Sequence, residues 1–141
     1  MLKILRRIHP NVWSNCLKVC DMKKIIVLGA GEMQIPVIQK VNEMGYVSIA
    51  LDYDENAVGF KYASKKYVVS STDTDKVLVV ASQEKADALL TTSDYPVNVV
   101  AEVGSIMGLP SMTPEVAKIC TNKYLQRKIF SENGINTPKK H

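Results

Sequence analysis

Short apolar runs of strand type alternate with segments of helical periodicity through most of the chain, and this alternation restricts the possible folds more than any other feature. The apolar runs are 25–29, 46–52, 66–70 and 87–92. Segments 32–44 and 73–83 repeat apolar residues every three or four positions, and Pro96 suits the first turn of a helix that ends near Met107. Strands that alternate with helices pair in parallel. The sequence therefore predicts an α/β fold, namely a three-layer α/β/α, Rossmann-like parallel sheet of four to five strands.

Residues at the expected helix ends support this assignment. Gly45 is expected to stop the first helix, whose apolar face is predicted to contain Met33, Val37, Val41 and Met44. Asp73 is expected to cap the second helix. Thr113, which is followed by proline, opens a later helix, and a last helix is predicted over roughly 122–132.

The chain of 141 residues is long enough for one domain, and its two ends differ in character from the middle. Residues 1–21 hold four basic residues against one acidic residue and are interrupted by a proline, so we interpret them as an atypical basic extension. An organelle-targeting segment is the alternative interpretation. Residues 22–112 are expected to form the Rossmann-like domain, and residues 113–141 the helices that follow it.

Composition argues against several classes of function. The net charge of +4 comes mostly from residues 1–21, so the rest of the chain shows no basic face that would favour nucleic acid. No apolar run approaches the roughly 20 residues that cross a bilayer, and no membrane partner is expected. Three cysteines, an odd number, do not suggest a disulfide framework, and a cytoplasmic protein is the default expectation. Cys16 and Cys20 lack the further ligands of a structural zinc site, and His9 and His141 lie outside the predicted fold, so no catalytic or metal-binding residue is assigned.

The stretch VLGAGEMQIPV, residues 27–37, is the main candidate for a binding loop because it follows the first predicted strand. Gly29, Gly31 and Asp52, which lies 21 residues after Gly31, fit a dinucleotide site. Gln34 stands where such a site needs a small residue, and Pro36 restricts where the helix can begin. A nicotinamide-binding oxidoreductase or sensor domain therefore stays an alternative, as does a tight turn without a ligand.

Three loops are expected to meet at the carboxyl edge of the sheet, where doubly wound folds bind ligands. They are 29–35 after the first strand, 52–60 after the second and 91–96 after the fourth. Tyr53 lies in one of these loops and either packs or contacts a ligand, and the sequence leaves both open.

Four stretches together resemble the N-terminal domain of ATP-grasp ligases, also called the pre-ATP-grasp domain, and the first helix of the module that follows it. They are IIVLGAGEMQIPVI, ALDYDENAVGFKYASKKYVVS, LLTTSDYPVNVVAEVGSIMGLP and TNKYLQRKIFSENGINTPK. This family couples ATP to a carboxylate or bicarbonate through an acyl phosphate, which an amine or other nucleophile attacks. It includes the formate-dependent glycinamide ribonucleotide transformylase, biotin carboxylase and carbamoyl phosphate synthetase.

The resemblance implies roles for particular residues. By similarity to the transformylase, Glu32, Met33 and Asp94 are substrate-binding candidates, together with Gly29, Gly31 and Asp52. Lys123, at the start of the last helix, is a candidate ATP contact. Departures are the sequence QIP where the family's loop has a further glycine, and an aspartate where the transformylase has a glutamate.

The resemblance also implies ATP and Mg²⁺ for the full-length family, with the adenine-binding strands and magnesium ligands later in the chain. We therefore expect these residues to be a substrate-side domain that lacks its ATP-grasp partner module and does not turn over alone. The expected partners are a small carboxylate or amine substrate, the missing module and, as a further possibility, a second copy in a homodimer.

Overall fold

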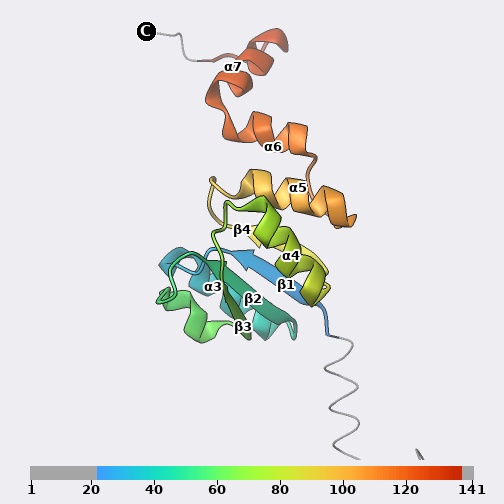
Figure 1. Ribbon diagram of the computed structural model, residues 1–141. Helices are drawn as coiled ribbons and strands as arrows, with labels where there is room; N and C mark the ends of the chain where they lie inside the picture. Colours follow the sequence, from blue (N-terminus) through green and yellow to red (C-terminus); the bar gives the residue numbers. More distant parts are fainter. Residues whose placement is uncertain (1–21, 138–141) are drawn as a thin grey trace, which may run out of the picture.

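A computed structural model describes residues 22–137 (Figure 1). Its centre is a four-stranded, all-parallel sheet in the order β3-β2-β1-β4. The strands are β1 Lys24–Leu28, β2 Val47–Asp52, β3 Lys65–Val68 and β4 Ala88–Thr91. All four predicted strands are confirmed, with shifts of one or two residues at their ends. The parallel α/β architecture is confirmed as well.

Helices cover both faces of the sheet. The helical elements are η1 Glu32–Gln34, α3 Ile35–Glu43, η2 Val58–Tyr62, α4 Thr74–Glu84, α5 Val97–Met107, α6 Pro114–Thr121 and α7 Lys123–Glu132, where η marks a 3-10 helix. One buried cluster joins the sheet to α4 and α5, and a second joins it to α3 and η2. Consecutive residues of β1 alternate between these clusters, since Ile26 and Leu28 belong to the first and Ile25 and Val27 to the second.

The first helix buries part of the face that its apolar spacing predicts, since Val41 is buried and Val37 packs half-buried against the core. Met33 is 77% exposed and Met44 57% exposed, so their predicted place on the buried face is wrong. The buried positions are Gln34, Ile38 and Val41. The physical reason for Met33 is that it lies in a separate 3-10 turn, which changes its angular position relative to α3 and turns the polar Gln34 inward. Met44 lies beyond the last residue of α3, as its C-cap.

The predicted caps are present. The Asp73 side chain accepts a hydrogen bond from the backbone N–H of Lys76, and the Thr113 hydroxyl accepts one from Val116. At α7 the Asn122 side chain accepts from the first two backbone N–H groups that follow Lys123. These short-range contacts form as the residue types predict.

Helices α6 and α7 continue from α5 away from the sheet (Figure 1). Helix α6 packs on α5, and α7 packs on α6. Helix α7 has no buried residue, and Tyr124 and Phe130 on it are exposed, as is Ile135 just after it. Helix α7 therefore presents exposed apolar side chains within the part of the chain that the structure describes.

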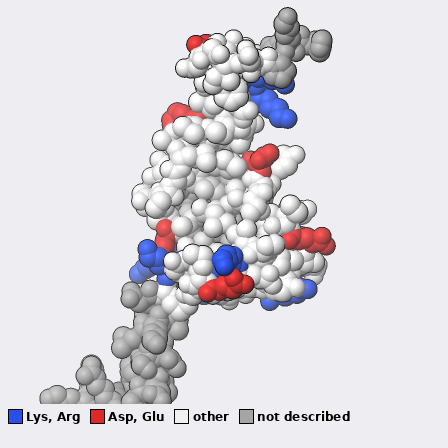
Figure 2. Space-filling model, turned by 180° about the vertical axis from the view of Figure 1, so that it is seen from behind, with Lys and Arg blue, Asp and Glu red and all other residues white. Residues whose placement is uncertain are grey.

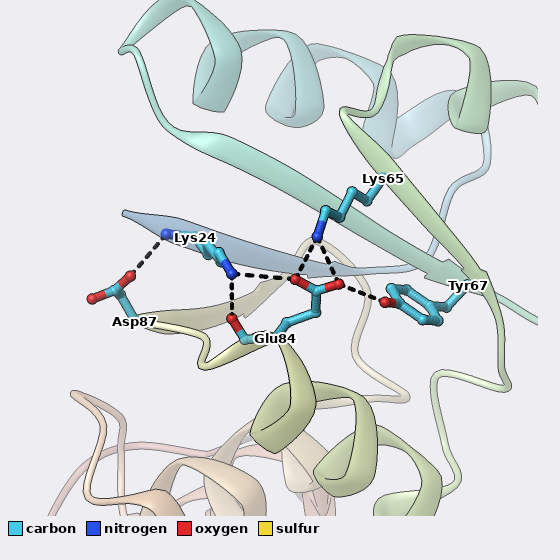
Figure 3. Close-up of polar contacts among 5 residues, drawn as sticks. All are labelled: Lys24, Lys65, Tyr67, Glu84 and Asp87. Carbon is cyan, nitrogen blue, oxygen red and sulfur yellow. Dashed lines mark hydrogen bonds and ion pairs between the residues drawn. The ribbon is translucent and has the colours of Figure 1, made fainter. Parts of the chain in front are cut away.

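A buried carboxylate connects α4 to the sheet at the edge where the strands begin (Figure 3). Glu84, whose side chain is 8% exposed, accepts hydrogen bonds from Lys65 at 2.8 and 2.9 Å, from Lys24 at 3.4 Å and from the Tyr67 hydroxyl at 2.5 Å. The bonds from Lys65 and Tyr67 lower the pKa of Glu84 to about 2, against the opposing effect of burial. The same contact raises the pKa of Tyr67, because a hydroxyl that donates to a carboxylate resists deprotonation.

On the face that Figure 2 shows, Lys and Arg side chains are scattered among Asp and Glu side chains. Within residues 22–137 no helix is long and apolar enough to cross a membrane. The interpretations of residues 1–21, of Cys16, Cys20 and His9, and of His141 fall outside the described residues.

Candidate functional site

A hollow of about 360 Å³ lies at the carboxyl edge of the sheet. Its lining comes from the segments that follow all four strands: Leu28, Gly29, Gly31 and Gln34, then Asp52 and Tyr53, then Ser70, Ser71 and Thr72, and finally Ser93, Tyr95 and Pro96. The chain reverses its strand order between β1 and β4, so this is the topological switch point at which open α/β sheets bind ligands. The structure thus brings residues of the three predicted loops together and adds a fourth loop, 70–72.

The glycine loop is shaped around the side chain of Gln34. The backbone of Gly29 has φ +99°, a conformation that residues other than glycine rarely adopt. A Cβ atom at Gly29 would lie 3.2 Å from the Gln34 Cδ, and one at Gly31 would lie 3.2 Å from the Gln34 Oε1. The Gln34 Nε2 donates a hydrogen bond of 2.8 Å to the Thr92 hydroxyl after β4. The two glycines therefore leave room for a buried glutamine that ties two loops of the hollow together.

Asp52 holds the same loop from the other side. Its Oδ2 accepts a hydrogen bond of 2.7 Å from the backbone N–H of Ala30, and its Oδ1 accepts one of 3.1 Å from Asp54. The Gly29 N–H donates to the Leu51 carbonyl at 2.7 Å. The Asp52 carboxylate, which a dinucleotide site would offer to a ribose, and the amides of Gly29 and Ala30 are thus engaged within the protein. This geometry does not favour the nicotinamide alternative.

Pro36 causes no defect in the helix. It occupies one of the first two positions of α3, where the missing N–H would have no helical partner. The 3-10 turn η1 connects the glycine loop to this start, and the Gln34 N–H donates to the Gly31 carbonyl at 3.1 Å. Gln34 and Pro36, which look like departures in a dinucleotide motif, are regular parts of this turn.

The remaining predicted site residues lie beside the hollow or away from it. Glu32, Met33 and Asp94 do not line it, but each is adjacent in sequence to a lining residue, and Glu32 and Met33 are exposed. Lys123 is the first residue of α7, beyond α6 and away from the sheet (Figure 1). The roles of these residues in binding stay predictions.

Sequence reasoning missed several lining residues. The hydroxyl residues Ser70, Ser71 and Thr72 were overlooked because only three loops were expected at this edge, although they directly follow β3. Ser93 and Tyr95 lie in the predicted loop 91–96, but the sequence does not single them out as candidates, and it leaves the role of Tyr53 open. Their position in the sequence could have indicated them, because residues that directly follow a parallel strand lie at the carboxyl edge of the sheet.

The residues from 22 to 137 contain no group of three or more His, Cys, Asp or Glu side chains placed to hold a metal ion. The magnesium that the family resemblance implies prefers several oxygen ligands together with phosphate oxygens. The side chains of residues 22–137 thus do not supply such a set of ligands by themselves.

Solved structures of ATP-grasp ligases share this fold. The phosphoribosylglycinamide synthetase of Anaerococcus prevotii superposes with a TM-score of 0.74 and 23% identity, over 83% of this chain and 30% of that one. The N5-carboxyaminoimidazole ribonucleotide synthetase of Thermotoga maritima superposes with a TM-score of 0.70 and 21% identity, over 84% of this chain and 32% of that one. The fold is that of the N-terminal, Rossmann-like domain of ATP-grasp ligases, as the sequence resemblance predicts.

The sequence is also similar to curated enzymes that share one name. The formate-dependent phosphoribosylglycinamide formyltransferase of Methanocaldococcus jannaschii is 29% identical over 119 residues, which are 82% of this chain and 30% of the relative. The enzyme of the same name from Proteus mirabilis is 36% identical over 67 residues, or 48% of this chain and 17% of the relative. The chain thus spans less than a third of the length of these relatives. No family model matches the sequence.

Proposed function

We propose that this chain is the substrate-side domain of an ATP-dependent ligase of the ATP-grasp class, which joins a carboxylate to an amine through an acyl phosphate. The single observation that carries the proposal is the closed glycine loop, in which Asp52 and Gln34 hold the backbone against the sheet. These contacts leave a hollow at the switch point and occupy the Asp52 carboxylate, which a dinucleotide would need for its ribose, together with the amides of Gly29 and Ala30. Similarity to the formyltransferases supports the same assignment.

Within this proposal the described residues bind and orient the small substrate. Glu32, Met33 and Asp94 stand next to the lining of the hollow and contact the part of the substrate that projects from it. Residues 22–112 make up this domain, and residues 113–141 begin the module that binds ATP and Mg²⁺, with Lys123 as an ATP contact. By itself the 141-residue polypeptide binds substrate and does not turn over ATP.

The names of the curated relatives suggest phosphoribosylglycinamide as the first substrate to test. We expect saturable binding of this compound to the purified chain by calorimetric titration, and no comparable binding of NADH. Glu32→Ala and Asp94→Ala are expected to weaken the binding. Glu43→Ala is the matched control, because Glu43 is an exposed acidic residue of α3 that does not line the hollow.

Two results would contradict the proposal. Preferential binding of NADH would favour the oxidoreductase or sensor alternative. ATP hydrolysis by the purified polypeptide in the presence of formate and phosphoribosylglycinamide would show that these residues are sufficient for turnover.

A further inference from the structure

Two tyrosine side chains at the mouth of the hollow have no packing role that explains their position. Tyr53 is 79% exposed and Tyr95 is 85% exposed, and both line the hollow. Exposed aromatic side chains that line a concave site often mark a binding surface, whereas single exposed apolar residues elsewhere on a protein are common and carry no such meaning. Tyr53 follows β2 and Tyr95 follows β4, the two strands that flank β1, so they approach the hollow from opposite sides of the glycine loop.

The lining between these tyrosines is rich in hydroxyl groups. Ser70, Ser71 and Thr72 contribute from the loop after β3, and Ser93 from the loop after β4. The Ser70 and Thr72 hydroxyls bond to each other at 3.0 Å. Within the described residues, no hydrogen bond involves the hydroxyl groups of Ser71 or Ser93. These groups can donate to a ligand and accept from it.

The charge of the lining is the third observation. Asp52 is the one charged side chain among the described residues that line the hollow, and no lysine, arginine or histidine is among them. A phosphate or carboxylate group inside the hollow would meet a carboxylate and no cation, which is unfavourable at short range. A neutral group with hydroxyl or amine donors meets acceptors instead.

We infer that the hollow binds an uncharged ring of the substrate that carries hydroxyl or amine groups, with Tyr53 and Tyr95 in contact with the ring. The inference rests on the proposed function and deepens it, because it assigns the ring of the substrate to this domain and its acidic groups to a place outside the hollow. Tyrosine contributes a large contact area and a polar tip, which suits a ring of this kind.

The test uses three probes with the purified chain: inosine, inosine 5′-monophosphate and methyl β-D-ribofuranoside. Binding is followed by NMR, through the tyrosine ring signals and the backbone amides of residues 70–72. Inosine is expected to bind, and the monophosphate no more tightly than inosine at low ionic strength. If the ribofuranoside binds, a sugar ring alone is sufficient for binding. If inosine binds and the ribofuranoside does not, the planar ring is required. Both outcomes support the inference.

Tyr53→Ala and Tyr95→Ala are each expected to weaken inosine binding about two- to tenfold, in line with the loss of one aromatic contact. Tyr124→Ala is the matched control, because Tyr124 is 60% exposed and lies on α7, outside the lining. Both tyrosines of the hollow are exposed, so their replacement is not expected to impair folding.

Three results would overturn the inference: no saturable binding of either uncharged probe at millimolar concentration, variants that bind inosine like the wild type, or a monophosphate that binds tenfold more tightly than inosine. The proposed function fails on a different result, namely that the wild-type chain binds NADH in preference to phosphoribosylglycinamide. The two ideas can therefore fail separately.

Discussion

Replacing Glu84 by glutamine removes one negative charge and keeps the shape of the side chain. Glu84 is the central acceptor of the cluster that connects α4 to β1 and β3, where Lys65 and Tyr67 donate at short distances (Figure 3). In the variant Lys24 and Lys65 lose their carboxylate partner, and glutamine replaces charge-assisted bonds by weaker neutral ones. We expect a less stable domain with an unchanged fold.

The magnitude follows from the pKa of Glu84, which the cluster lowers from an ordinary value of 4.5 to about 2. One pKa unit corresponds to about 1.4 kcal/mol, so this shift corresponds to about 3.5 kcal/mol before screening. Water partly screens the pair, since 47% of the Lys65 side chain is exposed. We therefore expect Glu84→Gln to lower the free energy of unfolding by about 2 kcal/mol at pH 7.

The pH dependence has a defined sign. The pKa of Glu84 is lower in the folded state than in the unfolded state, so its charge stabilises the fold above about pH 4.5 and this contribution is lost as the pH falls from 4.5 towards 2. The difference in stability between wild type and variant should therefore be constant near neutral pH and shrink in that acidic range. The variant should also bring the raised pKa of Tyr67 back towards its usual value.

Urea unfolding followed by circular dichroism, in a series of buffers from neutral to acidic pH, measures the stability difference. An NMR titration of the assigned Tyr67 ring signals follows that residue among the six tyrosines. Glu43→Gln is the control, because the Lys40–Glu43 pair at 3.2 Å is exposed on both sides and is expected to contribute under about 0.5 kcal/mol. The reasoning is refuted if the Glu84 variant is as stable as the wild type at pH 7, or if its loss of stability is the same at neutral and acidic pH.

Three further substitutions test other contacts. Gly59→Ala should destabilise the domain by about 1–3 kcal/mol, because the new Cβ would lie 2.6 Å from the Ala30 carbonyl oxygen; an unchanged melting temperature would contradict this. Gln34→Leu keeps the volume but loses the bond to Thr92, so urea unfolding should show a loss of about 1–2 kcal/mol, and equal stability would mean that the bond contributes nothing net. Asn122→Ala removes the cap of α7 and should speed hydrogen exchange of the first amides of that helix, equivalent to about 1 kcal/mol of local stability; unchanged exchange would argue against the cap.

The fold could be predicted from local patterns because its elements depend on neighbours in the sequence. Alternating strand runs and helical segments indicated the parallel sheet, and Asp73 and Thr113 indicated helix starts that the structure contains. The angular position of the first helix could not be predicted in the same way. Its apolar spacing indicated Val37 and Val41 correctly, but it also pointed to Met33 and Met44, which are exposed, and missed the buried Gln34 and Ile38.

The candidate site could be predicted only in outline. The rule that ligands bind at the carboxyl ends of parallel strands placed Gly29, Gly31 and Asp52 at the correct edge. The same rule placed the loop 91–96 there, although no motif singled out Tyr95. The hydroxyl groups of residues 70–72 carry no motif and lie at the hollow because β3 ends beside it.

By itself, the sequence determined the parallel α/β class, the caps of the helices and a resemblance to ATP-grasp ligases, because these depend on residue type and short spacing. Tertiary structure decided what the odd residues of VLGAGEMQIPV do. Gln34 bonds to a hydroxyl 58 positions away, and Asp52 bonds to an amide 22 positions away. Contacts at such separations depend on how the strands are ordered in space, which no local pattern records. They turn an apparent dinucleotide loop into a closed turn beside a hydroxyl-lined hollow that holds no basic side chain.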